Sequence, residues 1–295
     1  MQIIKYKFIP LALSALLTVA SVWAMWNFGY REGIDFSGGT LWQIKIEGVT
    51  KESLKDYLGN KLKLDEAIIT EEAATQSFLV RLKETNEADH QKHLAALKKD
   101  FKGIQELRFE TIGPAIGGEL RSKAIWAFVL VLLGISLYIA FAFRQVSRQV
   151  SSWKYGLITL LTLFHDAIIA AGFYVWLGLT RGAELDTNFI IGVLVVIGFS
   201  VHDTIVVFDR IRENLRLQKG NEDFGSLVNR SINETMARSI NTSLTLFLIL
   251  IAMFFVGAEP LKNFVLLILV GTIIGTYSSI FVASPLLVLW KGKAK

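Results

Sequence analysis

The chain has 295 residues, of which 52% are hydrophobic and 19% charged, with a formal net charge of +5. Charged residues are concentrated between residues 29 and 122, and the rest of the chain carries apolar runs of membrane-spanning length. This pattern excludes a soluble globular protein and an intrinsically disordered one. It also argues against an outer-membrane barrel, whose strands alternate polar and apolar residues. Because the chain has no cysteine, disulfides, thiolate metal sites and cysteine nucleophiles are excluded.

Six apolar segments are long enough to cross a bilayer core of about 30 Å as helices. They are residues 8–28, 124–143, 155–179, 187–208, 239–258 and 264–290. The first run is longer than the apolar part of a signal peptide, so we expect an uncleaved helix. The last run exceeds the required length and contains Pro285, which predicts a tilt or a break near its end.

Lysine and arginine residues near the span ends predict the orientation, because basic loops stay in the cytoplasm. One set of helix ends carries Lys5, Lys7, Arg144, Arg148, Lys154, Arg210, Arg212, Arg216, Lys219, Arg230, Lys291, Lys293 and Lys295. The short alternate loops carry only Arg181 and Lys262. We therefore expect both termini in the cytoplasm and residues 29–122 outside the cell membrane. The net charge is then an orientation signal at the lipid surface, and no nucleic-acid partner is expected.

The external segment shows the periodicities of a small α+β domain. Alternating residues predict strands at 41–47, 67–71, 77–83 and 105–112, and leucine spacing predicts helices at 51–62 and 87–101. The order β-α-β-β-α-β is typical of a ferredoxin-like fold, with a mainly antiparallel sheet and both helices on one face. His90 and His93 are three residues apart on the second helix. A metal pair is one interpretation, and a solvated helix face is the more ordinary one.

Glycine-rich segments join this domain to the membrane spans at residues 33–40 and 112–118. Adjacent glycines allow positive φ or a close approach of two backbones. A phosphate-binding nest is an alternative, but no Gly-Lys-Ser/Thr follows and the first segment leads into a strand. We expect no cofactor, and we predict hinge or docking roles for Gly33, Asp35, Gly38, Gly39, Gly117 and Gly118. The predicted parts are thus residues 1–28, 29–122 and 123–295.

Ionisable side chains inside the spans are costly and usually face a bundle interior or a water-filled path. We predict a proton path formed by His165, Asp166, His202, Asp203 and Arg238. Helix rise places Asp203 about 8 Å and Asp166 about 16 Å from the inner ends of their spans. Arg238 lies near the inner boundary, where its side chain can either reach toward Asp203 or extend out to the membrane surface. Burial favours a protonated carboxyl group and a nearby guanidinium favours the carboxylate, so a balance of the two would let Asp203 exchange a proton near neutral pH. A static buried pair is the alternative.

Two other chemistries are weaker explanations of these residues. The two His-Asp dipeptides contain metal-binding side chains, but adjacent residues on a helix point about 100° apart, so we predict no metal site. Ser200 lies two residues before His202, but no nucleophile motif surrounds it, so we predict no catalytic residue and no enzyme.

Small and amphipathic stretches predict packing surfaces. In the last span a stripe of small residues at every fourth position predicts close helix packing, and it comprises Gly271, Gly275, Ser279 and Ala283. Polar residues share one helix face at Thr159, Thr162 and Asp166, and another at Arg238, Asn241 and Thr245. Residues 224–232 are amphipathic, which predicts a helix along the cytoplasmic interface.

Five segments in this order resemble the SecF family of bacterial protein-export membrane subunits. They are residues 33–40 (GIDFSGGT), 164–166 (FHD), 198–214 (GFSVHDTIVVFDRIREN), 234–245 (ETMARSINTSLT) and 275–285 (GTYSSIFVASP). The resemblance implies a helical membrane protein that is similar to half of a resistance-nodulation-division transporter. It also implies SecD and the SecYEG channel as partners, exported polypeptide as substrate, and use of the proton gradient. The family's proton-path aspartate and arginine correspond to Asp203 and Arg238.

Two alternatives to this function remain open from the sequence. One is a proton-coupled exporter of small molecules or lipids from the same superfamily, which the compact external domain disfavours. The other is a structural scaffold of the translocon, in which the acidic residues only pack. The coupling ion, H⁺ or Na⁺, is not specified by the sequence.

Overall fold

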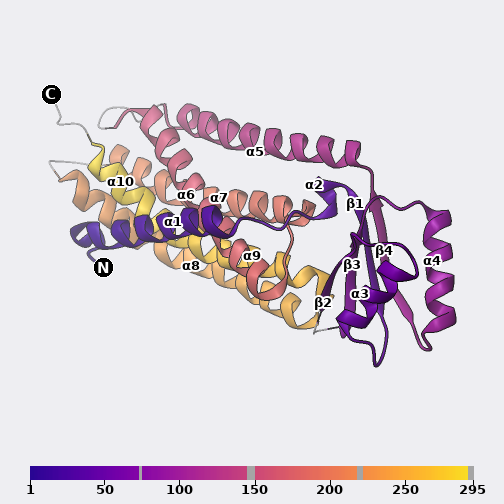
Figure 1. The fold of residues 1–295 in the computed structure, drawn as a ribbon. Helices are drawn as coiled ribbons and strands as arrows, with labels where there is room; N and C mark the ends of the chain where they lie inside the picture. Colours follow the sequence, from indigo (N-terminus) through magenta and orange to yellow (C-terminus); the bar gives the residue numbers. More distant parts are fainter. Residues whose placement is uncertain (73–74, 145–149, 218–221, 292–295) are drawn as a thin grey trace. The chain divides into compact units, whose positions relative to one another are not determined.

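The computed structural model describes residues 1–72, 75–144, 150–217 and 222–291 (Figure 1). The orientation residues Arg148, Lys219, Lys293 and Lys295 lie outside the described residues. The chain forms two compact units. The helical unit comprises Met1–Tyr30, Trp126–Ala183 and Asn188–Lys295, and the α+β unit comprises Arg31–Ile125 together with Glu184–Thr187.

The α+β unit has the predicted ferredoxin-like topology. Its elements are α2 (Ile34–Ser37), β1 (Gly39–Lys45), α3 (Lys51–Asn60), β2 (Ile68–Glu72), β3 (Ser77–Leu82), α4 (Glu87–Asp100) and β4 (Gln105–Ile112). All neighbouring strands are antiparallel, in the order β2-β3-β1-β4. The side chains of α3 and α4 share one core with alternate residues of the sheet, so both helices cover the same face (Figure 1).

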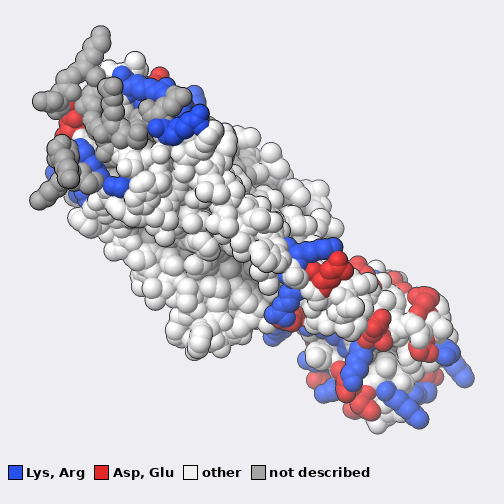
Figure 2. Space-filling view, turned by 90° about the horizontal axis from the view of Figure 1, so that it is seen from above, with Lys and Arg blue, Asp and Glu red and all other residues white. Residues whose placement is uncertain are grey.

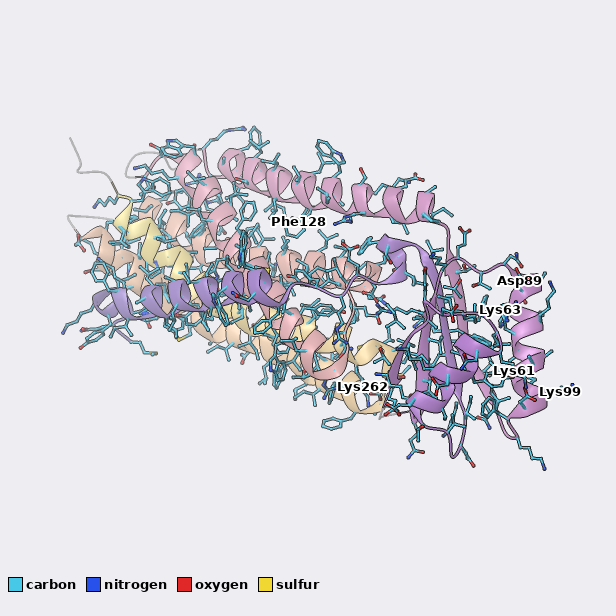
Figure 3. The ribbon with its side chains drawn as sticks, viewed as in Figure 1. Lys61, Lys63, Asp89, Lys99, Phe128 and Lys262 are labelled. Atoms are coloured by element: carbon cyan, nitrogen blue, oxygen red, sulfur yellow. The ribbon has the colours of Figure 1, made fainter. Side chains whose placement is uncertain are left out.

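A capping box begins α3, and side-chain contacts near its other end join it to α4. Thr50 and Ser53 form a capping box at the start of α3. At the other end, the Lys61 Nζ atom and the Tyr57 hydroxyl each lie 2.5 Å from Asp100 Oδ2 on α4. Figure 3 shows Lys61 beside α4, near Lys99. Burial, and then the hydrogen bond and charge of Asp100, raise the pKa of Tyr57 to about 12. The hydrogen bonds from Lys61 and then Tyr57 lower the pKa of Asp100.

His90 differs from the expected solvated helix face, because its side chain is only 3% exposed. The ring stacks on Phe109 with centroids 3.5 Å apart, and Nε2 lies 2.9 Å from Glu106 Oε2. Trp42 Nε1 donates to the same oxygen at 3.2 Å. The aromatic contacts and the Glu106 bond thus draw His90 into the domain core. No group of three metal-ligating side chains occurs among the described residues.

Among the described residues, six helical segments are long and apolar enough to cross a membrane, as predicted, so the chain is a multi-pass membrane protein. Most of their residues belong to the helical unit. The six segments are α1 (Phe8–Phe28), α5 (Pro114–Ala142), α6 (Ser152–Arg181), α7 (Thr187–Leu217), α8 (Phe224–Val256) and α9 (Lys262–Ser278), which continues through a π-helical turn (Ser279–Ala283) into α10 (Ser284–Leu289). The predicted irregularity near Pro285 is this π turn. Figure 2 shows a long stretch of this unit without charged side chains on the face drawn.

Two local expectations were wrong. Gly117 and Gly118 lie inside α5, which begins at Pro114, rather than in a linker; proline is well suited to the first turn of a helix. Residues 224–232 do not form a separate interfacial helix, because they are the first turns of α8. Their apolar side chains are buried within the helical unit, where α8 contacts α10 and the short helix η1 (Ile4–Tyr6).

Candidate functional site within the membrane helices

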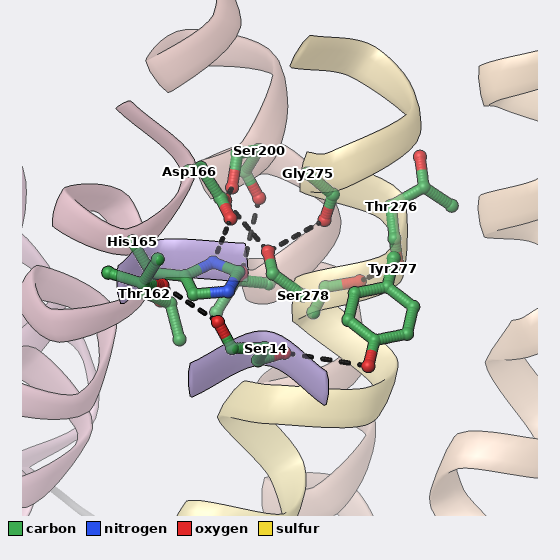
Figure 4. Close-up of polar contacts among 12 residues, drawn as sticks. Ser14, Thr162, His165, Asp166, Ser200, Gly275, Thr276, Tyr277 and Ser278 are labelled. Carbon is green, nitrogen blue, oxygen red and sulfur yellow. Dashed lines mark hydrogen bonds and ion pairs between the residues drawn. The ribbon is translucent and has the colours of Figure 1, made fainter. Parts of the chain in front are cut away.

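Asp166 on α6 is completely buried and joins three helices. The hydroxyls of Ser200 on α7 and Ser278 on α9 both donate to its Oδ2 atom, the second at 2.7 Å. The neighbouring His165 places Nδ1 2.8 Å from Asp166 Oδ1 (Figure 4). Each carboxylate oxygen therefore has a hydrogen-bonding partner, although no lysine or arginine contacts the group among the described residues.

His165 and Asp166 were expected to point apart, because they are adjacent on a helix. The structure brings them into contact instead. Both side chains have rotatable bonds that turn the imidazole and the carboxylate towards each other. The second ring nitrogen of His165, Nε2, is buried and has no hydrogen-bond partner within the described part of the chain.

Glycines on α9 allow the close helix contact on which the Asp166 site depends. A Cβ atom built on Gly275 would lie 2.9 Å from Ser200 Cβ, and one on Gly271 would lie 2.1 Å from Val196 Cγ2. Any larger residue would therefore push α9 away from α7. Ser279 and Ala283, the other members of the small-residue stripe, are buried in the π turn.

Asp203 lies one helical turn after Ser200 on α7 and is 1% exposed. The hydroxyls of Ser239 and Ser243 on α8 and of Thr276 on α9 lie beside its carboxyl group. Ser243 and Thr276 also contact each other, with 2.5 Å between their oxygens. Asp203 Oδ2 and Ser239 Oγ are both buried without a hydrogen-bond partner among the described residues. The site is thus a buried carboxyl group with an incomplete set of partners.

Arg238 and His202 are both exposed on the helical unit, and of the two it is His202, the neighbour of Asp203 in the chain, that acts electrostatically on the Asp203 carboxyl group. No ion pair between Arg238 and Asp203 occurs in the described ranges, so of the two alternatives for Arg238 the structure has the one in which its side chain lies away from Asp203. The reason is the helix phase. Ser239, the residue after Arg238, faces Asp203, so Arg238 points about 100° away. Arg238 shares its exposed face with Asn241 and Thr245, whereas Thr159 and Thr162 are buried with Asp166.

Several hydroxyl residues that surround the two aspartates were not predicted from the sequence. Ser200 was considered only as a nucleophile. The others are Ser239, Ser243, Thr276 and Ser278. A signal was present, because Ser200 precedes Asp203 by one turn and Ser239 precedes Ser243 by one turn. Spacing on one helix does not show which neighbouring helix a hydroxyl faces, so the two clusters could not be assembled from it.

The predicted hinge and docking glycines form a tightly packed junction within the α+β unit. Gly38 and Gly39 have φ of 71° and 114°, and Cβ atoms on them would lie 2.8 Å from Pro114 Cα and from Leu82 O. A Cβ on Gly117 would lie 3.0 Å from Gly38 N, whereas Gly118 has open space around it. Most of this segment is therefore closely packed, and side chains would disrupt it.

Comparison with known proteins relates this chain to a family of protein-export membrane proteins. Residues 92–293 match the family described as protein export membrane protein SecD/SecF, C-terminal. The chain is 40% identical to protein translocase subunit SecF of Thermobaculum terrenum, over 99% of this chain and 94% of the relative. It is also 40% identical to protein translocase subunit SecDF of Thermus thermophilus, but it spans only 38% of that longer protein.

Solved structures give the same result. The chain matches the crystal structure of SecDF, a translocon-associated membrane protein from Thermus thermophilus, with a TM-score of 0.85 and 36% identity. The match covers 99% of this chain and 38% of that one. A super-membrane-facing form of SecDF gives a TM-score of 0.68. The chain therefore belongs to the SecD/SecF family of protein export membrane proteins.

Proposed function

We propose that the chain is the SecF-like subunit of a protein translocase and works with SecD and SecYEG in the cytoplasmic membrane. It uses the proton gradient to promote late steps of polypeptide export, with both termini in the cytoplasm and the α+β unit outside. Transport rather than catalysis is the proposed activity. The observation that carries the proposal is Asp203, a buried carboxyl group with an unpartnered oxygen among hydroxyls from two other helices.

Proton uptake at Asp203 would change the hydrogen bonds between helices. A protonated carboxyl group gains one donor, and Ser239 Oγ is an acceptor without a partner beside it. The ionised group instead only accepts, and the hydroxyls of Ser239, Ser243 and Thr276 must then turn their O–H bonds towards it. Each protonation state therefore favours a different arrangement of α7, α8 and α9, which is the two-state element that coupling requires.

Asp166 and Arg238 have different places in this proposal. Asp166 and His165 form a second ionisable pair, and Ser200 links that pair to the helical turn before Asp203. Arg238 lies on an exposed face of a membrane helix, where a guanidinium needs an acidic or polar partner. A carboxylate from SecD is the partner that we propose.

The test replaces Asp203 with asparagine, which keeps the shape of the side chain but cannot exchange a proton. In vesicles that contain the chain with SecD and SecYEG, we expect Asp203→Asn to abolish gradient-dependent export and proton flux. Membrane insertion and copurification of SecD should be unchanged. The matched control is Asp209→Asn, an exposed carboxylate on the same helix. Normal export by Asp203→Asn would favour the scaffold function and would overturn the proposal.

A further inference from the structure

The connection between α6 and α7 belongs to the α+β unit rather than to the helices that it joins. Residues Glu184–Thr187 group with the sheet domain, although α6 ends at Arg181 and α7 begins at Thr187. The two helices that carry Asp166 and Asp203 are therefore joined through a segment of the external domain.

Backbone pairing holds this connection to the chain that follows α1. Leu185 N donates to Arg31 O at 2.7 Å, and Gly33 N donates to Leu185 O at 2.9 Å. Glu32 and Leu185 form a parallel bridge. A Cβ on Gly33 would lie 3.0 Å from Leu185 O, so the two backbones are in close contact here and a side chain would need a shift of only a few tenths of an ångström.

Two side-chain contacts reinforce the pairing. Arg81 on β3 forms an ion pair with Glu184, and their side chains are only 21% and 16% exposed. Asp35, in the segment before β1, accepts a hydrogen bond from Thr187 N at 2.8 Å. This bond satisfies a backbone N–H at the start of α7 that has no partner within the helix, and the negative carboxylate interacts favourably with the positive end of the helix dipole. The sheet thus holds the connection, and Asp35 holds the first residue of α7.

We propose that the α6–α7 connection, held by Arg81 and Asp35, is the rigid link that transmits movement of α6 and α7 to the external domain. This inference rests on the proposed function. Asp166 lies 15 residues before the end of α6, and Asp203 lies 16 residues after the start of α7. Helix rise converts these separations to about 22 and 24 Å. A shift of either helix along its axis reaches the sheet through a paired segment with two charged contacts.

Charge reversal tests the role of Arg81 as a positioning residue. In vesicles with SecD and SecYEG, we expect Arg81→Glu and Glu184→Arg each to lower gradient-dependent export about tenfold, a typical size for coupling between two sites. Proton flux should remain near the wild-type value, which distinguishes lost coupling from a lost relay. The double variant restores the pair with reversed charges and should recover most of the export. Lys83→Glu is the matched control, because its pair with Glu66 is exposed.

An engineered disulfide provides a second, independent measurement. A Cβ on Gly33 would lie 3.5 Å from Asp186 Cβ, within the range of about 3.5–4.5 Å for disulfides, and the chain has no other cysteine. In the Arg81→Glu background, the Gly33→Cys/Asp186→Cys pair should restore export when oxidised and lose it again on reduction. Bond formation is verified by mass spectrometry before export is measured.

The outcomes separate this inference from the proposed function. Normal export by Arg81→Glu would overturn the proposed rigid link. So would a lack of recovery in both rescue variants, the charge-swapped double variant and the verified disulfide variant. If Asp203→Asn still loses export and flux in the same vesicles, the proposed function stands without the link. If Asp203→Asn exports normally, the proposed function is overturned, and the inference that rests on it is overturned with it.

Discussion

Carboxylates in the two units have different partners. In the α+β unit they pair with cations, as in Lys61–Asp100, Lys83–Glu66 and Arg121–Glu32. In the apolar interior of the helical unit, Asp166 and Asp203 meet hydroxyls and one imidazole, and the described ranges place no lysine or arginine against them. Exposed ion pairs contribute little to stability, whereas a buried carboxyl group without a cation is costly. The buried aspartates therefore indicate function more strongly than the surface pairs do.

The two buried aspartates also differ from each other. Asp166 has a partner on each oxygen, and its site ties α6 to α7 and α9. Asp203 has an oxygen without any partner. We infer that Asp166 contributes more to the stability of the bundle and Asp203 more to proton exchange.

The largest stability difference is expected from alanine substitutions at these two positions. Asp166→Ala leaves the Ser200 hydroxyl and His165 Nδ1 without their partner, whereas Ser278 keeps Gly275 O as an acceptor, and each buried unsatisfied group costs about 1–3 kcal/mol. The expected total loss is larger than that of Asp203→Ala, because one oxygen of the Asp203 carboxyl group already lacks a partner. Denaturant unfolding of the full chain in detergent measures both. Equal losses would contradict the distinction between a structural and an exchanging aspartate.

A smaller effect is expected where α9 contacts α7 beside both sites. Gly271→Ala forces Val196 to move and should cost about 1–3 kcal/mol, as overpacking usually does. Val196→Ala should recover part of that loss in the double variant. Gly134→Ala on α5 is the control, since no atom lies near its Cβ position, and it should be neutral or stabilising. A neutral Gly271→Ala would show that the helices tolerate a wider separation.

The fold was predictable where periodicity carries the information. Leu54 and Leu58, four residues apart, indicated α3 and are both buried in the domain core. The first apolar run, 8–28, has the same bounds as α1. Periodicity was less informative at the ends of spans. The amphipathic turns from Phe224 onwards continue directly into α8, because a helix can extend beyond the bilayer without any break in its hydrogen bonding.

The candidate site was predictable only in part, because it depends on contacts between helices. Asp166 and Asp203 were identifiable from the cost of a carboxylate in an apolar run. Their hydroxyl partners come from helices distant in sequence, such as Ser278, which is 112 residues from Asp166. Which face of α8 meets α7 decides that Ser239, and not Arg238, lies beside Asp203. The sequence of one chain does not specify which face of a helix packs against a neighbouring helix.

The smallest expected effect concerns the cation-paired carboxylates of the α+β unit. The hydrogen bond from Lys61, and then that from Tyr57, hold the pKa of Asp100 below its ordinary value of 3.8. A lowered pKa in the folded state stabilises the fold above pH 3.8, and this contribution is lost as pH falls through the folded-state pKa. Asp100→Asn should therefore lower the unfolding midpoint of the full chain slightly at pH 7, and the difference from wild type should shrink towards pH 3. The control is Asp56→Asn, an exposed carboxylate on α3. If the two variants behave alike at both pH values, the Lys61–Asp100 pair does not stabilise the domain, and the contrast between the units rests on the buried aspartates alone.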